Sequence, residues 1–95
     1  MLDIDFRIKL AIAKGRNIIY YRERDTRVRC QYIHIIREFR TQLVQMLNEI
    51  PKDHVYRKFI INLISVIHPK VESKQCVRAI LKMKKVYTYY GIPIE

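Results

Sequence analysis

The sequence has few residues that would divide it into short elements. Only two glycines and three prolines occur among its 95 residues, and these are the residues that most often form turns or interrupt helices and strands. Their scarcity favours a few long regular elements over a β-sandwich, which needs many turns. Apolar residues make up 49% of the chain, too many for a disordered one. The length predicts one domain, residues 1–95.

Long apolar runs and a cysteine framework are also missing. The most apolar stretch, residues 59–67, is far shorter than the roughly 18–20 residues of a membrane-spanning helix, so no membrane span is predicted. The first residues lack the basic region, apolar core and small-residue cleavage site of a secretory signal. Cys30 and Cys76 lie far apart and are expected to be reduced thiols. We therefore expect an intracellular protein of the cytoplasm or nucleus that is not secreted.

The clearest pattern lies at residues 28–50, where apolar residues recur at steps of three and four. This spacing places them on one side of an α-helix. Asp25 or Thr26 is a suitable N-cap for this central helix, and Pro51 ends it because the residue before a proline avoids helical geometry. The residues of the stripe are Tyr32, Ile36, Phe39, Leu43, Met46 and Ile50.

Two further helices are predicted after Pro51. Residues 54–67 follow a potential N-cap at Asp53 and are apolar on almost every side, which is typical of a helix inside a bundle or one covered by a partner chain. Residues 71–90 form the next helix, which Gly91 and Pro93 should terminate.

The first segment, residues 2–24, fits two structures. Apolar residues at every second position from 2 to 12 indicate a strand, whereas Ile4, Ile8 and Ile12 also share a helical face. We favour a helix, with Gly15 as the point where it bends or breaks. The predicted fold is therefore all-α, a small three- to four-helix bundle. The alternative is an α+β fold with an N-terminal β-hairpin at 2–22 packed on three helices.

The predicted core combines the apolar stripes of the three later helices. Its members are Ile36, Phe39, Leu43, Leu47, Phe59, Ile60, Leu63, Ile64, Ile67, Val77, Ile80 and Leu81.

No catalytic constellation can be assembled from the sequence. Cys30 and His34 have the spacing of a helical pair, but a packed thiol and a surface or boundary histidine is the favoured interpretation. The histidines and cysteines show no paired metal-ligand spacing, and the isolated glycines form no phosphate-binding loop. We predict that the protein is not an enzyme and has no metal site and no cofactor.

The charge is the unusual feature of this chain. Nineteen lysines and arginines against nine acidic residues give a formal net charge of +10. A charge of this size on one small protein favours polyanionic partners, which include nucleic acid, an anionic membrane surface and an acidic protein.

Two basic clusters, each close to tyrosines, are the candidate binding residues. The first lies around the turn into the central helix, beside Tyr20 and Tyr21. The second forms a stripe on the last helix, with Tyr87, Tyr89 and Tyr90 beyond it. Cationic side chains bind phosphates, and exposed tyrosines can stack on unpaired bases. The candidate residues are Arg16, Arg22, Arg24, Arg27 and Arg29 in the first cluster, and Lys74, Arg78, Lys82 and Lys85 in the second.

We therefore predict non-catalytic binding of nucleic acid, RNA or DNA, through contacts of basic helical faces with the phosphate backbone. The alternative is a small basic adaptor or assembly subunit. Such a protein would bind an acidic partner protein, or form a homodimer through apolar helix faces, chiefly that of residues 54–67.

Overall fold

The computed structural model describes residues 3–24 and 32–94, and within these ranges it contains helices and no strand. The prediction of an all-α bundle is confirmed. The α-helices are α1 (Ile4–Arg24), α2 (Ile33–Leu47), α3 (Arg57–Val66) and α4 (Cys76–Tyr89), and a short 3₁₀ turn, η1 (Ser73–Gln75), precedes the last one. No helix in the described ranges combines the length and the apolar character needed to cross a membrane.

The alternative of an N-terminal β-hairpin is wrong, because residues 4–24 form one continuous helix. Its buried face contains Ile8, Ile12 and Ile19 at helical spacing. In a strand of alternating residues, Phe6 and Leu10 would lie on the same face as Ile8. Instead they are 47% and 50% exposed.

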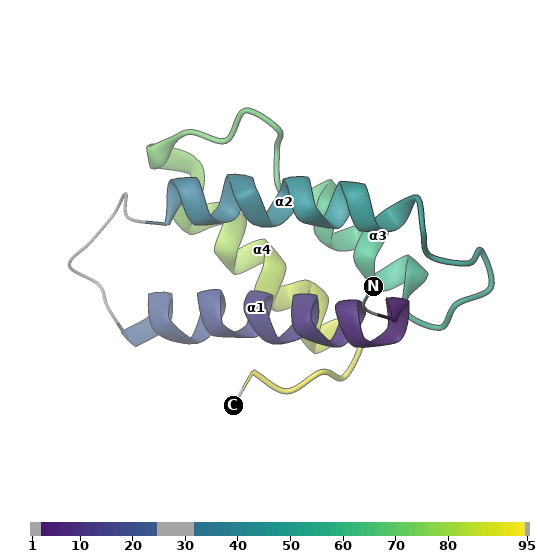
Figure 1. The fold of residues 1–95 in the computed structure, drawn as a ribbon. Helices are drawn as coiled ribbons and strands as arrows, with labels where there is room; N and C mark the ends of the chain where they lie inside the picture. The colour runs from purple at the N-terminus through teal and green to yellow at the C-terminus, as the bar shows by residue number, and fades with distance from the viewer. Residues whose placement is uncertain (1–2, 25–31, 95) are drawn as a thin grey trace.

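The four helices pack in a closed cycle. The contacts join α1 to α2, α2 to α3, α3 to α4 and α4 back to α1. Figure 1 shows α1 and α2 side by side and running in opposite directions, while α4 crosses behind them obliquely. The segment after α4 returns beneath α1. This arrangement leaves an outer groove between α3 and α4, and a second hollow between α1 and the end of the chain.

Most of the predicted core is confirmed. Leu47, Ile64 and Val77 are only half-buried, and Leu81 is wrong because it is 54% exposed. Leu81 directly follows the buried Ile80, and one residue rotates a helix by about 100°, which turns the Leu81 side chain away from the core. The predicted core residues found buried are Ile36, Phe39, Leu43, Phe59, Ile60, Leu63, Ile67 and Ile80.

Helix α3 is less enclosed than its apolar sequence predicts. It packs against α2 and α4, and its outer side exposes Lys58, Ile61 and Ser65. A helix inside the bundle would be covered on this side as well, so of the two predicted positions the internal one is not found, and cover by a partner chain stays a prediction.

Several predicted helix ends shift. Residue 56, not Asp53, is the N-cap of α3, and it makes no side-chain capping hydrogen bond. The predicted N-caps of α2, Asp25 and Thr26, lie outside the described residues. Gly91 ends α4 as predicted, with a φ of 70° in the left-handed region that favours glycine. Its N–H donates to Thr88 O at 3.0 Å.

Gly15 does not bend or break α1. It is buried in the middle of the helix, where the absence of a side chain allows the rings of Phe39 from α2 and Tyr87 from α4 to approach closely. Glycine occupies this position because of packing between helices, and α1 remains regular through it.

Candidate nucleic-acid interface

Three arginines that contribute to the high net charge stabilise the fold. Arg37 donates from Nε and Nη2 to Val71 O at 2.9 and 2.6 Å, and Arg40 Nε donates to Ile67 O at 2.7 Å. Arg57 Nη1 donates to carbonyl oxygens near the end of α2. Carbonyls at helix ends lack intrahelical donors. Arg40 and Arg57 supply such donors at the ends of α3 and α2, and Arg37 donates to a carbonyl in the segment after α3. None of the three is therefore available to a ligand without a cost in stability.

Other cations are paired with acidic or amide side chains. Arg7 contacts Glu49 at 2.8 Å, and Lys84 forms an ion pair with Glu23 that joins α4 to α1. Lys14 Nζ donates to the side chain of Gln42 at 3.0 Å. A ligand that used any of these cations would have to compete with an existing contact.

The described members of the first predicted cluster lie in different surroundings. Arg24 lies over the ring of Tyr20, with its Cζ 3.4 Å from the ring centroid, and Nη1 donates to Tyr20 O at 3.2 Å. Arg22 lines a small hollow between α1 and α4. Arg16 lines a different hollow, beneath the segment that follows α4. The remaining members, Arg27 and Arg29, lie outside the described residues.

The second predicted cluster lies on one face of α4. Arg78, Lys82 and Lys85 line the groove between α3 and α4, which consists of two adjoining hollows of about 200 and 250 Å³. Lys82 and Val66 line both hollows, so the two form one continuous surface. No Asp or Glu of the described residues lines either hollow. We call this surface the α3–α4 groove.

The cations of the α3–α4 groove are available to a ligand. Arg78, Lys82 and Lys85 are exposed, and they make no hydrogen bond or ion pair with any residue that the structure describes. They follow one another at steps of four and three residues, so their Cα atoms cover about 10 Å of helix. Lys74 extends the series by one turn, 3.9 Å from Glu72 and with 80% of its side chain exposed.

The tyrosines near this stripe have different environments. Tyr87 is fully buried, so its predicted place beside the cations is wrong; burial raises the pKa of its hydroxyl group well above the ordinary value. Tyr89 is 82% exposed and lines the α3–α4 groove. Tyr90 also lines it, and its hydroxyl oxygen accepts a hydrogen bond from Asn62 Nδ2 at 2.6 Å.

The α3 side of the groove was not among the predicted site residues. Asn62, Ser65 and His68 face the basic stripe and offer polar groups to a ligand. The periodicity of α4 alone predicts its own cationic face. No local signal in the sequence indicates which residues of another helix pack opposite that face.

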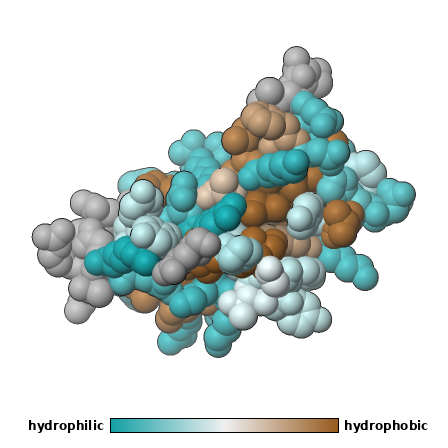
Figure 2. All heavy atoms as spheres, turned by 90° about the horizontal axis from the view of Figure 1, so that it is seen from below, coloured by the Kyte–Doolittle hydropathy of each residue, from teal (hydrophilic) through white to brown (hydrophobic). Residues whose placement is uncertain are grey.

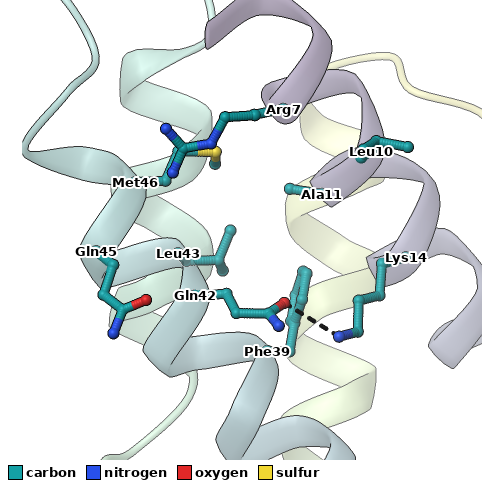
Figure 3. Close-up of a pocket in the computed structure, with 9 residues that line it drawn as sticks. All are labelled: Arg7, Leu10, Ala11, Lys14, Phe39, Gln42, Leu43, Gln45 and Met46. Carbon is teal, nitrogen blue, oxygen red and sulfur yellow. Dashed lines mark hydrogen bonds between the residues drawn. The ribbon is translucent and has the colours of Figure 1, made fainter. Parts of the chain in front are cut away.

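A third hollow, of about 250 Å³, lies between α1 and α2 (Figure 3). Ala11, Phe39 and Leu43 form apolar parts of its wall. Its cations are already engaged, since Lys14 is hydrogen-bonded to Gln42 and Arg7 is paired with Glu49. This hollow is therefore a weaker anion site than the α3–α4 groove.

The described residues contain no group of three or more His, Cys, Asp or Glu side chains that could hold a metal ion. The thiol of Cys76 is buried, while Cys30 lies outside the described ranges, so the Cys30–His34 pair has no observed geometry. Comparisons with known proteins find no matching family model, no similar curated protein and no similar solved structure.

Proposed function

We propose that this protein binds single-stranded nucleic acid without catalysis, through the α3–α4 groove. The observation that carries the proposal is the row of exposed cations on α4. Arg78, Lys82 and Lys85 line one continuous surface that contains no described carboxylate, and they have no competing partner among the described residues.

The residue types suit a phosphate backbone. The planar guanidinium group of Arg78 can contact two phosphate oxygens at once, and the two lysines provide flexible point charges. With Lys74 the stripe covers twelve residues, and their eleven steps span about 16 Å of helix. This is the rise of about five nucleotides at 3.4 Å per nucleotide. A short strand can therefore contact several cations at the same time.

The exposed tyrosine favours a single strand over a duplex. Tyr89 lies at the end of the stripe with 82% of its surface exposed, and its ring packs edge-on against Tyr90 with the centroids 5.1 Å apart. An unpaired base can stack on such a ring, whereas the bases of a duplex are already stacked on each other. On the α3 side, Asn62 has a second amide N–H that can donate to a base or a sugar hydroxyl group, and the hydroxyl oxygen of Ser65, which donates to Asn62 O, can accept a hydrogen bond.

Fluorescence anisotropy of labelled single- and double-stranded oligonucleotides across a salt series tests the proposal. In the test variant, Arg78, Lys82 and Lys85 are each replaced by Gln. The matched control replaces Lys52, Lys58 and Lys70 by Gln, because the side chains of these lysines are also exposed and form no hydrogen bond or ion pair with described residues. Both variants lose the same charge.

We expect the test variant to bind single strands at least tenfold more weakly. The slope of log K against log salt should fall by about 0.7 for each phosphate contact that is lost. The control should retain most of the affinity. Equal losses in both variants would mean that net charge alone attracts the oligonucleotide, and the proposal would be rejected.

A partner protein is the second candidate, favoured by Phe6 and Leu10. These side chains are 47% and 50% exposed and lie about one turn apart on α1, and Leu10 also lines the hollow between α1 and α2. A homodimer through α3 has less support, since Ile61, at 42% exposed, is the one apolar residue of that helix in the exposed class. Sedimentation equilibrium of the wild type and of Leu10→Ser tests self-association directly, and loss of a dimer in the variant would favour this candidate.

A further inference from the structure

A hollow of about 480 Å³ lies between α1 and the segment that follows α4. This hollow is separate from the α3–α4 groove, although Tyr90 lines both. Figure 2 views the molecule from below, where α1 and this segment form the surface, and shows apolar areas between hydrophilic side chains. We call this feature the α1–tail hollow; its walls include Lys9, Arg16, Tyr56, Tyr90 and residues 91–93.

The α1–tail hollow favours an anion. Lys9 and Arg16 lie seven residues apart, which places them on the same face of α1 two turns from each other. Neither side chain forms a hydrogen bond or ion pair with a residue that the structure describes, and no described carboxylate lines the hollow. Arg16 is half-buried, and a partly desolvated cation attracts an anion more strongly than a fully hydrated one does.

The hollow also presents aromatic surface. Tyr56 and Tyr90 both pack edge-on against Phe59, with ring centroids 6.4 and 5.5 Å from it. The hydrogen bond from Asn62 fixes the ring of Tyr90. Two positioned tyrosines beside two cations can recognise a planar aromatic group that carries negative charge.

We propose that the α1–tail hollow binds a nucleoside phosphate. The phosphate lies between Lys9 and Arg16, and the base packs against Tyr56 or Tyr90. Two sources can supply this chemistry. One is a free mononucleotide. The other is one unit of a strand whose remaining phosphates lie on the α4 stripe, since Tyr90 connects the two surfaces. Only the second source depends on the function proposed above.

Binding is tested by NMR titration of the isotopically labelled protein with AMP, adenosine and inorganic phosphate as probes. We expect AMP to shift the amide signals of residues around Lys9, Arg16 and Gly91. Its affinity should exceed that of adenosine and that of inorganic phosphate by about tenfold or more, because the hollow contacts both parts of the ligand. Equal binding of AMP and inorganic phosphate would overturn the proposal, since the tyrosines would then have no role.

The test variant replaces Lys9 and Arg16 by Gln, and the control replaces Lys52 and Lys70 by Gln. We expect the test variant to lose about tenfold or more in affinity for AMP and the control to remain near wild type. Arg16→Lys retains the charge and should retain most of the binding, which separates recognition from an effect on folding. Shifts located elsewhere, or equal losses in test and control, would reject the site.

Competition with a labelled oligonucleotide distinguishes the two sources. If AMP weakens oligonucleotide binding, the hollow holds a unit of the strand. If AMP binds at the hollow and leaves the oligonucleotide unaffected, the ligand is a free nucleotide. If no oligonucleotide binds but AMP still does, the proposed function fails while the site in the α1–tail hollow stands.

Discussion

The hydroxyl group of Tyr87 lies directly against Gly15, so that α4 meets α1 at the one position of α1 without a side chain. The same hydroxyl donates a hydrogen bond to Ile12 O at 2.7 Å, one turn earlier in α1. The ring of Phe39 from α2 reaches the same point. Three helices therefore meet at Gly15, and Tyr87 is the largest side chain that is fully buried there.

Replacing Gly15 by Ala should destabilise the protein. Alanine is the better helix former by about 1 kcal/mol, but its Cβ would lie 2.9 Å from Phe39 Cζ and closer still to the Tyr87 hydroxyl oxygen, nearer than real Cβ contacts. We expect a net loss of about 1–3 kcal/mol in the free energy of unfolding, measured by urea denaturation.

Tyr87→Phe provides the second side of a double-mutant cycle. This substitution removes the hydroxyl oxygen that a Cβ at residue 15 would meet first, so the cost of Gly15→Ala should be smaller in the Tyr87→Phe background. If Gly15→Ala costs the same in both backgrounds, or stabilises the wild type, then close packing against Tyr87 is not the reason for glycine at this position.

Ionisation of Tyr87 should destabilise the fold at alkaline pH. Burial raises its pKa above the ordinary value of 10.0, with the nearby charge of Arg16 opposing that effect. Since the folded state holds the proton more tightly than the unfolded state, the stability that Tyr87 contributes is complete below pH 10. It is lost as the pH rises toward the pKa of the folded state.

A spectrophotometric titration of tyrosinate absorbance measures this effect. We expect a delayed fraction of the absorbance change, equal to about one of the seven tyrosines, that appears only when the protein unfolds. In Tyr87→Phe the delayed fraction should be absent. A delayed fraction of unchanged size in that variant would assign the raised pKa to a different tyrosine.

Arg57 should be important for stability although it lies on the surface of a basic protein. Its Nη1 donates to Ile50 O at 2.7 Å and to Leu47 O at 3.2 Å. We expect Arg57→Gln to reduce the free energy of unfolding by about 1–3 kcal/mol, because carbonyls at the end of α2 lose a charged donor. The neighbouring Lys58→Gln should change it by about 0.5 kcal/mol or less. Equal effects in thermal or urea denaturation would contradict this role.

Local periodicity predicted the helices because each has an apolar residue at every third or fourth position, and these residues form one face. The same reasoning placed Leu81 in the core incorrectly, since a helix has room for only some of its apolar residues on the packed side. The N-terminal segment was ambiguous because its apolar residues satisfy two periods at once. The choice between helix and strand depends on the packing of Ile12 and Gly15 against Tyr87 of α4, which is more than 70 positions away in the sequence.

The sequence predicted only that part of the candidate site which the residues of one helix form. Arg78, Lys82 and Lys85 share a face because of their spacing, and the structure places them along one groove. Arg16 was grouped with Arg24 because the two are close in sequence, yet packing places Arg16 beside the end of the chain. Sequence position cannot separate them, because their surroundings are set by contacts between helices.

A comparison of two exposed arginines tests which basic cluster binds nucleic acid. Arg24 stacks on Tyr20 and donates to its carbonyl oxygen, so it must give up these contacts to reach a phosphate. Arg78 lines the α3–α4 groove and has no such contact with described residues. We expect Arg78→Gln to weaken oligonucleotide binding by about three- to tenfold and Arg24→Gln by about twofold or less, although both remove one charge.

Fluorescence anisotropy at one fixed salt concentration measures the affinity of both variants. A larger loss for Arg24→Gln would contradict the proposed interface. The ligand would then bind near the end of α1, in spite of the contacts that Arg24 makes with Tyr20.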